Sequence, residues 1–445
     1  MSKLIAAFLA IVLWPAAAFA QDSDAPPLEV DVIGGQQGNQ PVAVPTMAVP
    51  RPQETSAGNT VALSRSISEV IASDLRLTGV LTPIGPVGLR GLDFDEVTDP
   101  TFDDWRRAGA SALVSGFVES RGGDRITVGC YLFDTVTRRE LAREGFSVAA
   151  QDWRRAAHKC ADVVYTRLTG EGAFLDTRIV YVAETGPKNA RVKRIAIMDS
   201  DGSNHRYLTD GADTVVTPRF SPDGSQLVYM SYKGRRARAR VLDLATGQDR
   251  LLVPGTAFTF APRFSPDGRF IVFSMGTFGN SDIYIVPARG GEPRRLTTAP
   301  GVDTSPSFSP DGRQIVFESD RSGSQQLYVM NSDGSGERRI SFGGGSYASP
   351  VWSPRGDLIA FTRIGGGAFR IGVMSASGRG ERLLTNSWQD EGPSWAPNGQ
   401  FVMFHRTRRG SGEASLYAVP VGGGSARLLP TPLGGSDPSW SPLKD

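Results

Sequence analysis

One turn sequence recurs along the second half of the chain and constrains the fold more than any other feature. Ser-Pro-Asp-Gly is typical of a type I turn, because proline suits the second position of such a turn and glycine the last. The copies read PRFSPDG from Pro218 and from Pro262, PSFSPDG from Pro306, PVWSPRG from Pro350, PSWAPNG from Pro393 and PSWSP from Pro438. A turn repeated at such regular spacing indicates an array of similar structural units.

Each repeat contains four short stretches with strand-like composition. The Phe or Trp before the turn belongs to the first stretch, and a fully apolar stretch such as Ile315–Phe317 follows the turn. A third stretch, such as Gln326–Met330, and a fourth, such as Arg339–Ser341, complete the unit. Four strands in a repeat of about 44 residues predict the blade of a β-propeller.

The two ends of the repeat region complement each other. The first repeat begins at Ile179 and has no preceding Pro-x-Phe stretch, whereas the last copy, Pro438–Pro442, is a first strand alone. Together they make one blade, and a ring of blades needs such a closure. The sequence therefore predicts six four-stranded blades closed by the C-terminal strand, and an open array leaves the split blade unexplained.

The preceding residues predict a small α/β domain. A helix is expected from Asn59, with an apolar face that includes Leu63, Ile67 and Leu75, and Gly79 ends it. Strands and a second helix, from about Gln151 to Leu168, follow. The predicted organisation is a cleaved signal peptide (1–20), a flexible segment with the first strands (21–58), the α/β domain (59–172) and the all-β propeller (173–445).

The N-terminus is typical of a protein exported from the cytoplasm. Lys3 precedes an apolar run from Leu4 to Trp14, and the small-residue motif Ala18-Phe19-Ala20 predicts cleavage between Ala20 and Gln21. The apolar run is too short to span a membrane. We therefore expect a soluble, exported monomer, and a net charge of +2 gives no argument for nucleic-acid binding.

The two cysteines, Cys130 and Cys160, are both expected in the core of the α/β domain. Cys130 alternates with apolar residues of a strand, and Cys160 lies on the apolar face of the second helix. In an oxidising compartment a disulfide between them is plausible, and two buried free thiols are the alternative.

No motif predicts catalysis, a cofactor or a metal. The chain lacks a Gly-x-Ser-x-Gly nucleophile motif, and its three histidines, His158, His205 and His405, are far apart in the sequence. Asp199–Gly202 and Asn331–Gly334 resemble the start of a calcium loop. The same slot in other repeats holds unrelated residues, so a turn between strands explains both.

The segments before each first strand predict a binding surface. They connect the outer strand of one blade to the inner strand of the next and so surround one mouth of the central channel. An acidic ring with nearby aromatic side chains suits a polar or basic protein segment; the alternative is hydrated connecting loops. The candidate residues are Asp213, Thr214, Phe258, Thr259, Asp303, Thr304, Tyr347, Trp388, Asp390, Glu391 and Asp437.

The repeat P-x-[FW]-S-P-D-G, behind a signal peptide and a small α/β domain, resembles the TolB family of the Tol-Pal envelope system. The segments Leu168–Phe174 and Thr177–Tyr181 resemble the junction between the two domains of that family. The resemblance covers the whole mature chain. It implies a non-enzymatic periplasmic protein that supports envelope integrity and outer-membrane constriction during cell division.

The resemblance also implies two partners. The propeller mouth would receive the lipoprotein Pal, and the mature N-terminus would bind TolA, with other Tol-Pal or outer-membrane proteins as further candidates. The TolA segment falls on the alternating stretch Leu28, Glu29, Val30, Asp31, Val32 and Ile33, which suits strand addition. The extension Gln21–Pro27 departs from the family pattern. The alternative functions are an exported propeller that binds or hydrolyses peptides or glycans, and a purely structural scaffold.

Overall fold

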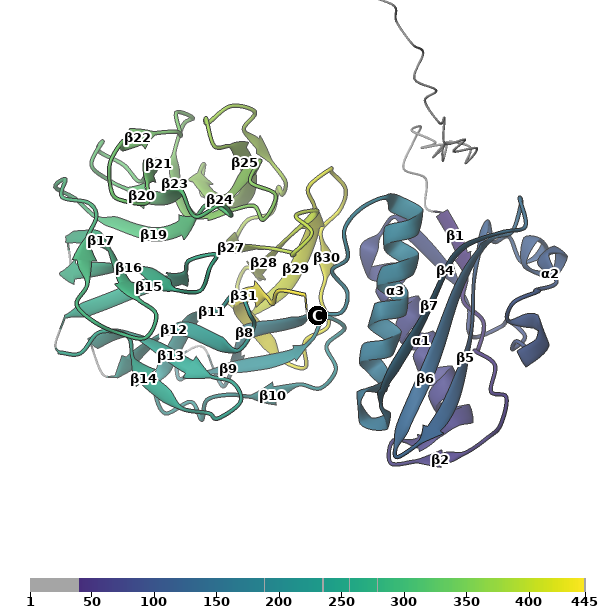
Figure 1. The fold of residues 1–445 in the computed structure, drawn as a ribbon. Coiled ribbons are helices and arrows are strands. Elements are labelled where there is room, and N and C mark those ends of the chain that lie inside the picture. Colours follow the sequence, from purple (N-terminus) through teal and green to yellow (C-terminus); the bar gives the residue numbers. More distant parts are fainter. Residues whose placement is uncertain (1–39, 188, 234–235, 256, 278, 444–445) are drawn as a thin grey trace, which may run out of the picture. The chain divides into compact units, whose positions relative to one another are not determined.

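The computed structural model describes residues 40–443 except 188, 234–235, 256 and 278 (Figure 1). The predicted signal peptide and the segment Leu28–Ile33 therefore lie outside the described residues. The described part contains an α/β domain followed by a six-bladed β-propeller of four-stranded blades, which confirms the predicted fold class. Among the described helices, none combines the length and apolar character needed to cross a membrane.

The α/β domain is built on one mixed sheet with the strand order β4-β1-β5-β6-β7. Strand β1 is parallel to both of its neighbours, and the remaining pairs are antiparallel. The elements are β1 (Gln40–Ala43), β2 (Glu54–Thr55), β3 (Gly58–Asn59), α1 (Thr60–Thr78), β4 (Leu81–Ile84), η1 (Phe94–Glu96), α2 (Phe102–Arg107), β5 (Ala112–Gly122), β6 (Arg125–Asp134), β7 (Arg139–Ala149), η2 (Ala150–Asp152) and α3 (Trp153–Thr169).

Helix α1 begins and ends where its sequence predicts. The Asn59 side chain accepts a hydrogen bond from the Val61 backbone amide, and Gly79 ends the helix in the left-handed conformation that glycine adopts at low cost. Helix α3 ends in the same way at Gly170. The apolar faces of both helices pack with the sheet in one core. Cys130 of β6 and Cys160 of α3 are joined in that core by a disulfide bridge.

Each propeller blade is an antiparallel four-stranded sheet. Five blades run consecutively along the chain, and the sixth pairs β31 with β8, so the last strand closes the ring as predicted. The strands, in blade order, are β8 (Arg178–Thr185), β9 (Val192–Asp199), β10 (Arg206–Tyr207); β11 (Thr214–Phe220), β12 (Gln226–Lys233), β13 (Arg236–Asp243), β14 (Asp249–Leu251); β15 (Phe258–Phe264), β16 (Phe270–Thr277), β17 (Asn280–Pro287), β18 (Arg294–Arg295); β19 (Asp303–Phe308), β20 (Gln314–Ser319), β21 (Gln326–Asn331), β22 (Arg338–Arg339); β23 (Ser346–Trp352), β24 (Leu358–Gly365), β25 (Ala368–Ser375), β26 (Arg382–Leu383); β27 (Asp390–Trp395), β28 (Phe401–Thr407), β29 (Ala414–Pro420), β30 (Arg427–Leu428); and β31 (Gly434–Trp440).

The first strand of every blade carries a bulge directly before its proline. The residue before the proline has a positive φ, near 50° at Thr217, Ala261 and Ser349 and 65° at Gly392. The bulge turns backbone amides toward the second strand of the preceding blade: the Ser349 amide donates to Glu318, and the Asp437 amide donates to His405. These contacts tie neighbouring blades together around the channel.

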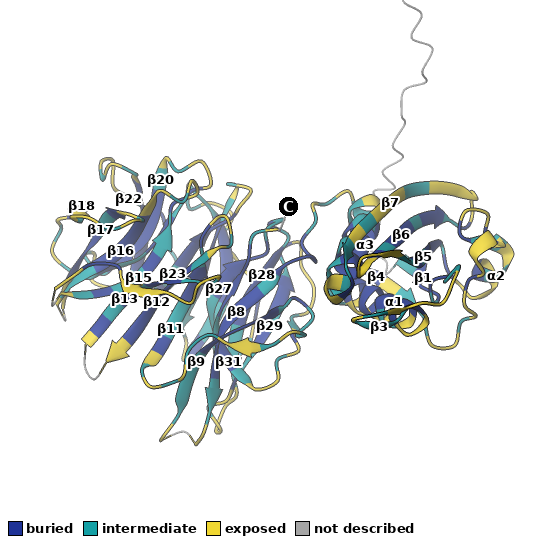
Figure 2. Cartoon of the chain, turned by 60° about the horizontal axis from the view of Figure 1, so that its bottom comes forward, coloured by how far each residue is buried: buried dark blue, intermediate teal, exposed yellow. Residues whose placement is uncertain are grey.

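The dark buried residues in Figure 2 run along the middle strands of the blades. The second strands are fully apolar at this level, with Phe273, Phe317, Phe361 and Phe404 among the largest fully buried side chains. Their equivalent positions in successive repeats explain why the repeat preserves an aromatic residue there.

Candidate functional site

The candidate site is the channel mouth where the six inner strands begin. The predicted residues Thr214, Phe258, Asp303 and Asp390 are the first residues of β11, β15, β19 and β27. Because these strands start at equivalent positions of successive blades, the connections before them lie at one end of the propeller.

Two carboxylates of the predicted acidic ring are paired within the propeller. The Asp303 and Asp390 side chains are both 0% exposed. The Asp303 carboxylate lies 2.6 Å from Arg321 Nη2, and Asp390 forms a two-bonded pair with Arg406 at 2.7 and 2.9 Å. Asp390 therefore holds the second strand of its own blade, β28, and Asp303 holds the loop that follows β20. The arginines lie 16 to 18 residues away in the sequence, so the spacing gave no sign of the pairing.

Three further candidates are also bonded within the propeller. The Asp213 carboxylate accepts a hydrogen bond from the Ser231 hydroxyl at 2.8 Å, and Thr259 Oγ1 accepts one from the Ala239 amide. The Tyr347 side chain is buried, and its hydroxyl donates to Glu381 at 2.8 Å. Burial raises the pKa of Tyr347 to about 12, which keeps this hydroxyl a donor.

A polar cluster remains at the inner rim. Glu391 accepts a hydrogen bond from the Gln389 side chain at 2.8 Å and lies 3.9 Å from His405 Nε2. The other ring nitrogen of His405 accepts the Asp437 amide at 3.3 Å. In the β19–β22 blade, two blades away, the Thr304 hydroxyl accepts a hydrogen bond from Ser274 at 3.2 Å.

The residues most accessible to a partner are Thr214, which is exposed, and Trp388, which is 41% exposed. The Arg409 guanidinium lies 5.9 Å from the centre of the Trp388 ring. The sequence analysis missed Phe342, which is 73% exposed on the connection between β22 and β23. An aromatic residue beside the glycine run 343–345 was the available signal.

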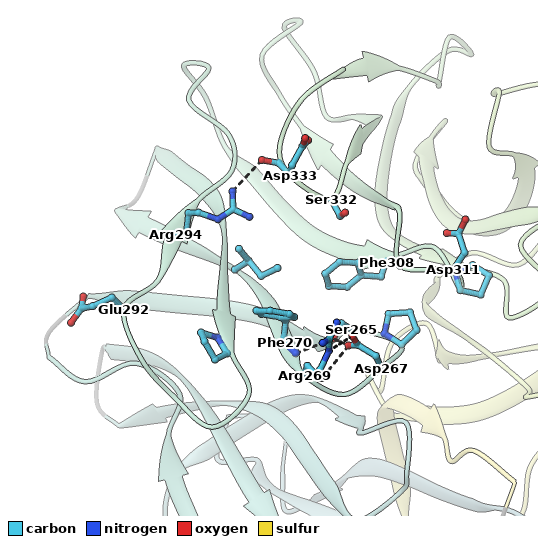
Figure 3. A pocket seen from close by; sticks show the side chains of 15 residues that line it. Ser265, Asp267, Arg269, Phe270, Glu292, Arg294, Phe308, Asp311, Ser332 and Asp333 are labelled. Atoms are coloured by element: carbon cyan, nitrogen blue, oxygen red, sulfur yellow. Dashed lines mark hydrogen bonds and ion pairs between the residues drawn. The ribbon is translucent and has the colours of Figure 1, made fainter.

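A groove of about 760 Å³ lies at the opposite, turn-bearing end of the blades formed by β15–β18 and β19–β22 (Figure 3). Phe270 and Phe308 lie along its floor. Around it, Arg269 forms an ion pair with Asp267 at 2.6 Å, and Arg294 donates to the backbone carbonyl of Asp333 at 3.1 Å. The groove therefore combines aromatic and charged side chains.

Comparison with known proteins identifies the two domains. Residues 28–141 match the family model of the TolB amino-terminal domain, and residues 165–444 match that of the TolB beta propeller domain. The chain belongs to the TolB family. The Tol-Pal system protein TolB of Zymomonas mobilis is 60% identical over 94% of this chain and 91% of that protein. The corresponding protein of Rhizorhabdus wittichii is 58% identical over 99% of both chains.

A solved TolB structure shows the same architecture. The crystal structure of TolB from Acinetobacter baumannii has a TM-score of 0.77 and 27% identity, covering 91% of this chain and 97% of that chain. TolB proteins are non-enzymatic members of the Tol-Pal system and typically periplasmic. This TolB family member is therefore a component of the Tol-Pal system, and membership of that system implies protein partners.

The segment that joins the two TolB domains is held by Asp162 of α3. Its carboxylate accepts the backbone amides of Phe174, Leu175 and Asp176 at 2.8 to 2.9 Å. The Phe174 ring stacks on Phe401 of β28, with 4.9 Å between ring centres. Residues of both domains thus share one apolar core.

A second set of polar contacts accompanies this core. His158 of α3 bonds to Asp74 of α1, and its other ring nitrogen lies 4.0 Å from Asp201 in the turn after β9. Arg154 also bonds to Asp201. One nitrogen or oxygen atom from each of His158, Asp199 and Asp201, of the kind that can coordinate a metal ion, lies within 4.8 Å of the others. Because Arg154 already pairs with the Asp201 carboxylate, we interpret these residues as an ion-pair network and not as a metal site.

Proposed function

We propose that this TolB family member binds Pal at the propeller mouth and TolA through its mature N-terminus, and that it acts in the periplasm in envelope integrity and outer-membrane constriction during division. The observation that carries the first part is the exposed Trp388 on a rim whose inner strands are fixed by buried ion pairs. Partially exposed tryptophans on rigid scaffolds are frequent anchors of protein interfaces.

A partner that binds the mouth meets mainly aromatic side chains on a rigid surface and few free charges. Asp303 and Asp390 are neutralised by arginines, which leaves Glu391 and Asp437 as half-buried carboxylates near the channel. Trp388 and Phe342 are the exposed aromatic side chains of the connections before β27 and β23. We therefore assign the affinity for Pal mainly to aromatic burial and only secondarily to the acidic groups.

The proposal is tested by calorimetric titration of the mature protein with the soluble domain of Pal from the same cell. Saturable 1:1 binding is expected, with the Kd rising roughly tenfold or more in Trp388→Ala, as is typical of an interface anchor. Phe270→Ala is the matched control, because Phe270 is an aromatic residue, 36% exposed, at the opposite end of a blade. Equal loss in both variants would exclude the mouth as the site.

We propose that the second partner, TolA, takes the segment Leu28–Ile33 by strand addition. Export through the signal peptide, with cleavage between Ala20 and Gln21, would place this segment near the mature N-terminus. A synthetic peptide of residues 21–36 should bind the TolA domain, and a peptide with Val30 and Val32 changed to aspartate should not. Binding of both peptides would contradict recognition by apolar alternation.

A further inference from the structure

Two arginines face the turn-bearing end of the channel without a carboxylate partner. Arg219 and Arg263 follow the proline of β11 and β15, in neighbouring blades. The equivalent positions in the other four blades hold Ser307, Val351, Ser394 and Ser439. All six side chains line one hollow of about 400 Å³, which we call the turn-side hollow.

The partners of the two guanidinium groups are incomplete. Arg219 is 8% exposed, and its Nη1 donates to the carbonyls of Pro218, Asp437 and Pro438 at 2.8 to 3.3 Å. Within the described part of the chain, neither Arg219 nor Arg263 has a carboxylate within ion-pair distance. The nearest acidic group acting on Arg219 is Asp437, whose carboxylate accepts the Thr217 amide at 3.4 Å.

Two arginines that line the same hollow without a carboxylate partner repel each other. Burial and then the charge of Arg219 lower the pKa of Arg263 well below its ordinary value. Burial likewise lowers the pKa of Arg219. At the mouth, by contrast, Arg321 and Arg406 form ion pairs with the buried Asp303 and Asp390. The lack of a carboxylate partner is therefore specific to the two arginines at the turn-bearing end. An anion placed between the two groups would relieve the repulsion.

The remainder of the hollow indicates the kind of anion. The residue after each of the six positions is aromatic and also lines the hollow, as do prolines of the repeated turns. The aromatic residues are Phe220, Phe264, Phe308, Trp352, Trp395 and Trp440. A guanidinium group pairs with a carboxylate through two parallel hydrogen bonds. An apolar rim around two such groups suits a carboxylate carried on an apolar body.

We propose that the turn-side hollow binds an organic carboxylate between Arg219 and Arg263. The carboxylate belongs to a small molecule or to the C-terminus of a peptide, and the two sources share this chemistry. The hollow lies at the opposite end of the channel from the mouth assigned to Pal, so it is a separate site on the same propeller.

The test uses benzoate, which has an apolar ring and a carboxylate, against benzamide, its neutral counterpart. Thermal unfolding and calorimetry are carried out on the mature protein at constant ionic strength. Benzoate is expected to raise Tm and to give saturable binding, whereas benzamide has no effect. A Tm increase with phosphate but not with benzoate would overturn the carboxylate assignment.

The decisive variant is Arg263→Ser, because serine is the natural residue at three of the six equivalent positions. It should weaken benzoate binding roughly tenfold or more, as expected for one charge-assisted pair. Without benzoate, its Tm should equal or exceed that of the unchanged protein, since the repulsion is relieved. Arg313→Ser, which removes a side chain 85% exposed on a neighbouring turn, is the control for net charge. Equal benzoate binding by all three proteins would overturn the proposal.

The source of the carboxylate is distinguished with a tripeptide that ends in phenylalanine. A peptide with a free C-terminus that binds at least tenfold tighter than benzoate, and loses this affinity on C-terminal amidation, assigns the site to a peptide terminus. Binding no tighter than benzoate assigns it to small carboxylates. Equal binding of the free and amidated peptides contradicts carboxylate recognition.

Discussion

His158 Nδ1 lies 2.6 Å from the Asp74 carboxylate, with both side chains at most 3% exposed. Burial opposes the charged imidazole, but the carboxylates of Asp74 and Asp201 outweigh it and raise the pKa of His158 to about 9. The contact joins α3 to α1, and the Asp201 side extends it to the propeller. This charged histidine therefore contributes to the stability of the junction between the domains.

The first prediction concerns the pH dependence of stability. Below pH 6.5 the histidine is protonated in both the folded and the unfolded chain, so its contribution is fully present. As the pH rises from 6.5 toward 9, only the folded state keeps the proton, and the contribution is lost. The free energy of unfolding should fall over this window by on the order of 3 kcal/mol. Asp74, with a pKa raised by burial to about 6, is already ionised there.

The measurement is urea unfolding at several pH values. His158→Gln should be less stable at pH 6.5 and should flatten the decline toward pH 9. His205→Gln is the control, because burial lowers the pKa of His205 and its contribution has the opposite sign. A decline of equal size in His158→Gln would assign the pH dependence to other groups.

A second prediction concerns Asp162, which accepts three backbone amides of the interdomain segment. Asp162→Ala leaves these buried donors without an acceptor and should cost about 3 kcal/mol of unfolding free energy. Asp162→Asn keeps one oxygen and should cost less. Asp152→Ala, at an exposed position just before α3, should change the unfolding free energy little. Equal effects of the three substitutions in urea unfolding would exclude this role.

The sequence predicted the ring well and the chemistry of its mouth less well. Turn and strand periodicities are local, so the six blades and the closing strand near Pro438 follow from the repeat alone. The pairing of Asp303 with Arg321 depends on side-chain direction between the start of β19 and the loop after β20, which periodicity does not specify. The sequence could not predict that Arg219 and Arg263 lack a carboxylate partner either, because this depends on which side chains surround them in the folded protein.

The composition of strand β1 gave no sign of a strand in the sequence. Gln40–Ala43 lies in the α/β sheet between β4 and β5, within a region that the sequence assigned to a flexible segment with the first strands. Four residues that include a proline give almost no periodic signal. Their place in the sheet is set by parallel pairing with Leu81–Ile84, which lies about 40 residues later in the chain.

A third prediction separates structure from binding at the mouth. Asp303→Ala removes the buried one of the two carboxylates that pair with Arg321, the other being Glu337, and should destabilise the propeller by about 2 kcal/mol. A double-mutant cycle with Arg321→Ala should show a coupling of at least about 1 kcal/mol. Pal affinity of the folded Asp303→Ala protein should change less than that of Trp388→Ala. The reverse order would restore Asp303 as a contact residue.

A fourth prediction concerns the disulfide. Replacing both Cys130 and Cys160 by alanine opens a loop closed over 30 residues and should lower the free energy of unfolding by about 3 kcal/mol. Reducing agent should destabilise the unchanged protein by a similar amount and leave the double variant unaffected. A reductant effect on the double variant would show that it does not act through this bridge.

The last prediction is that the N-terminal segment and the propeller mouth are coupled. If residues 21–36 either dock on the protein or are released to TolA, and Pal shifts that choice, then deleting them should change the Kd for Pal by the coupling factor. Linkage requires that Pal change the affinity for TolA by the same factor, so the two titrations check each other.

Calorimetry of Pal with the full mature chain and with the deletion variant measures the first factor, and TolA titration with and without saturating Pal measures the second. Trp388→Ala, which weakens Pal binding itself, should leave TolA affinity unchanged in the absence of Pal. Identical Pal affinities with and without residues 21–36 would contradict the coupling and leave two independent binding sites.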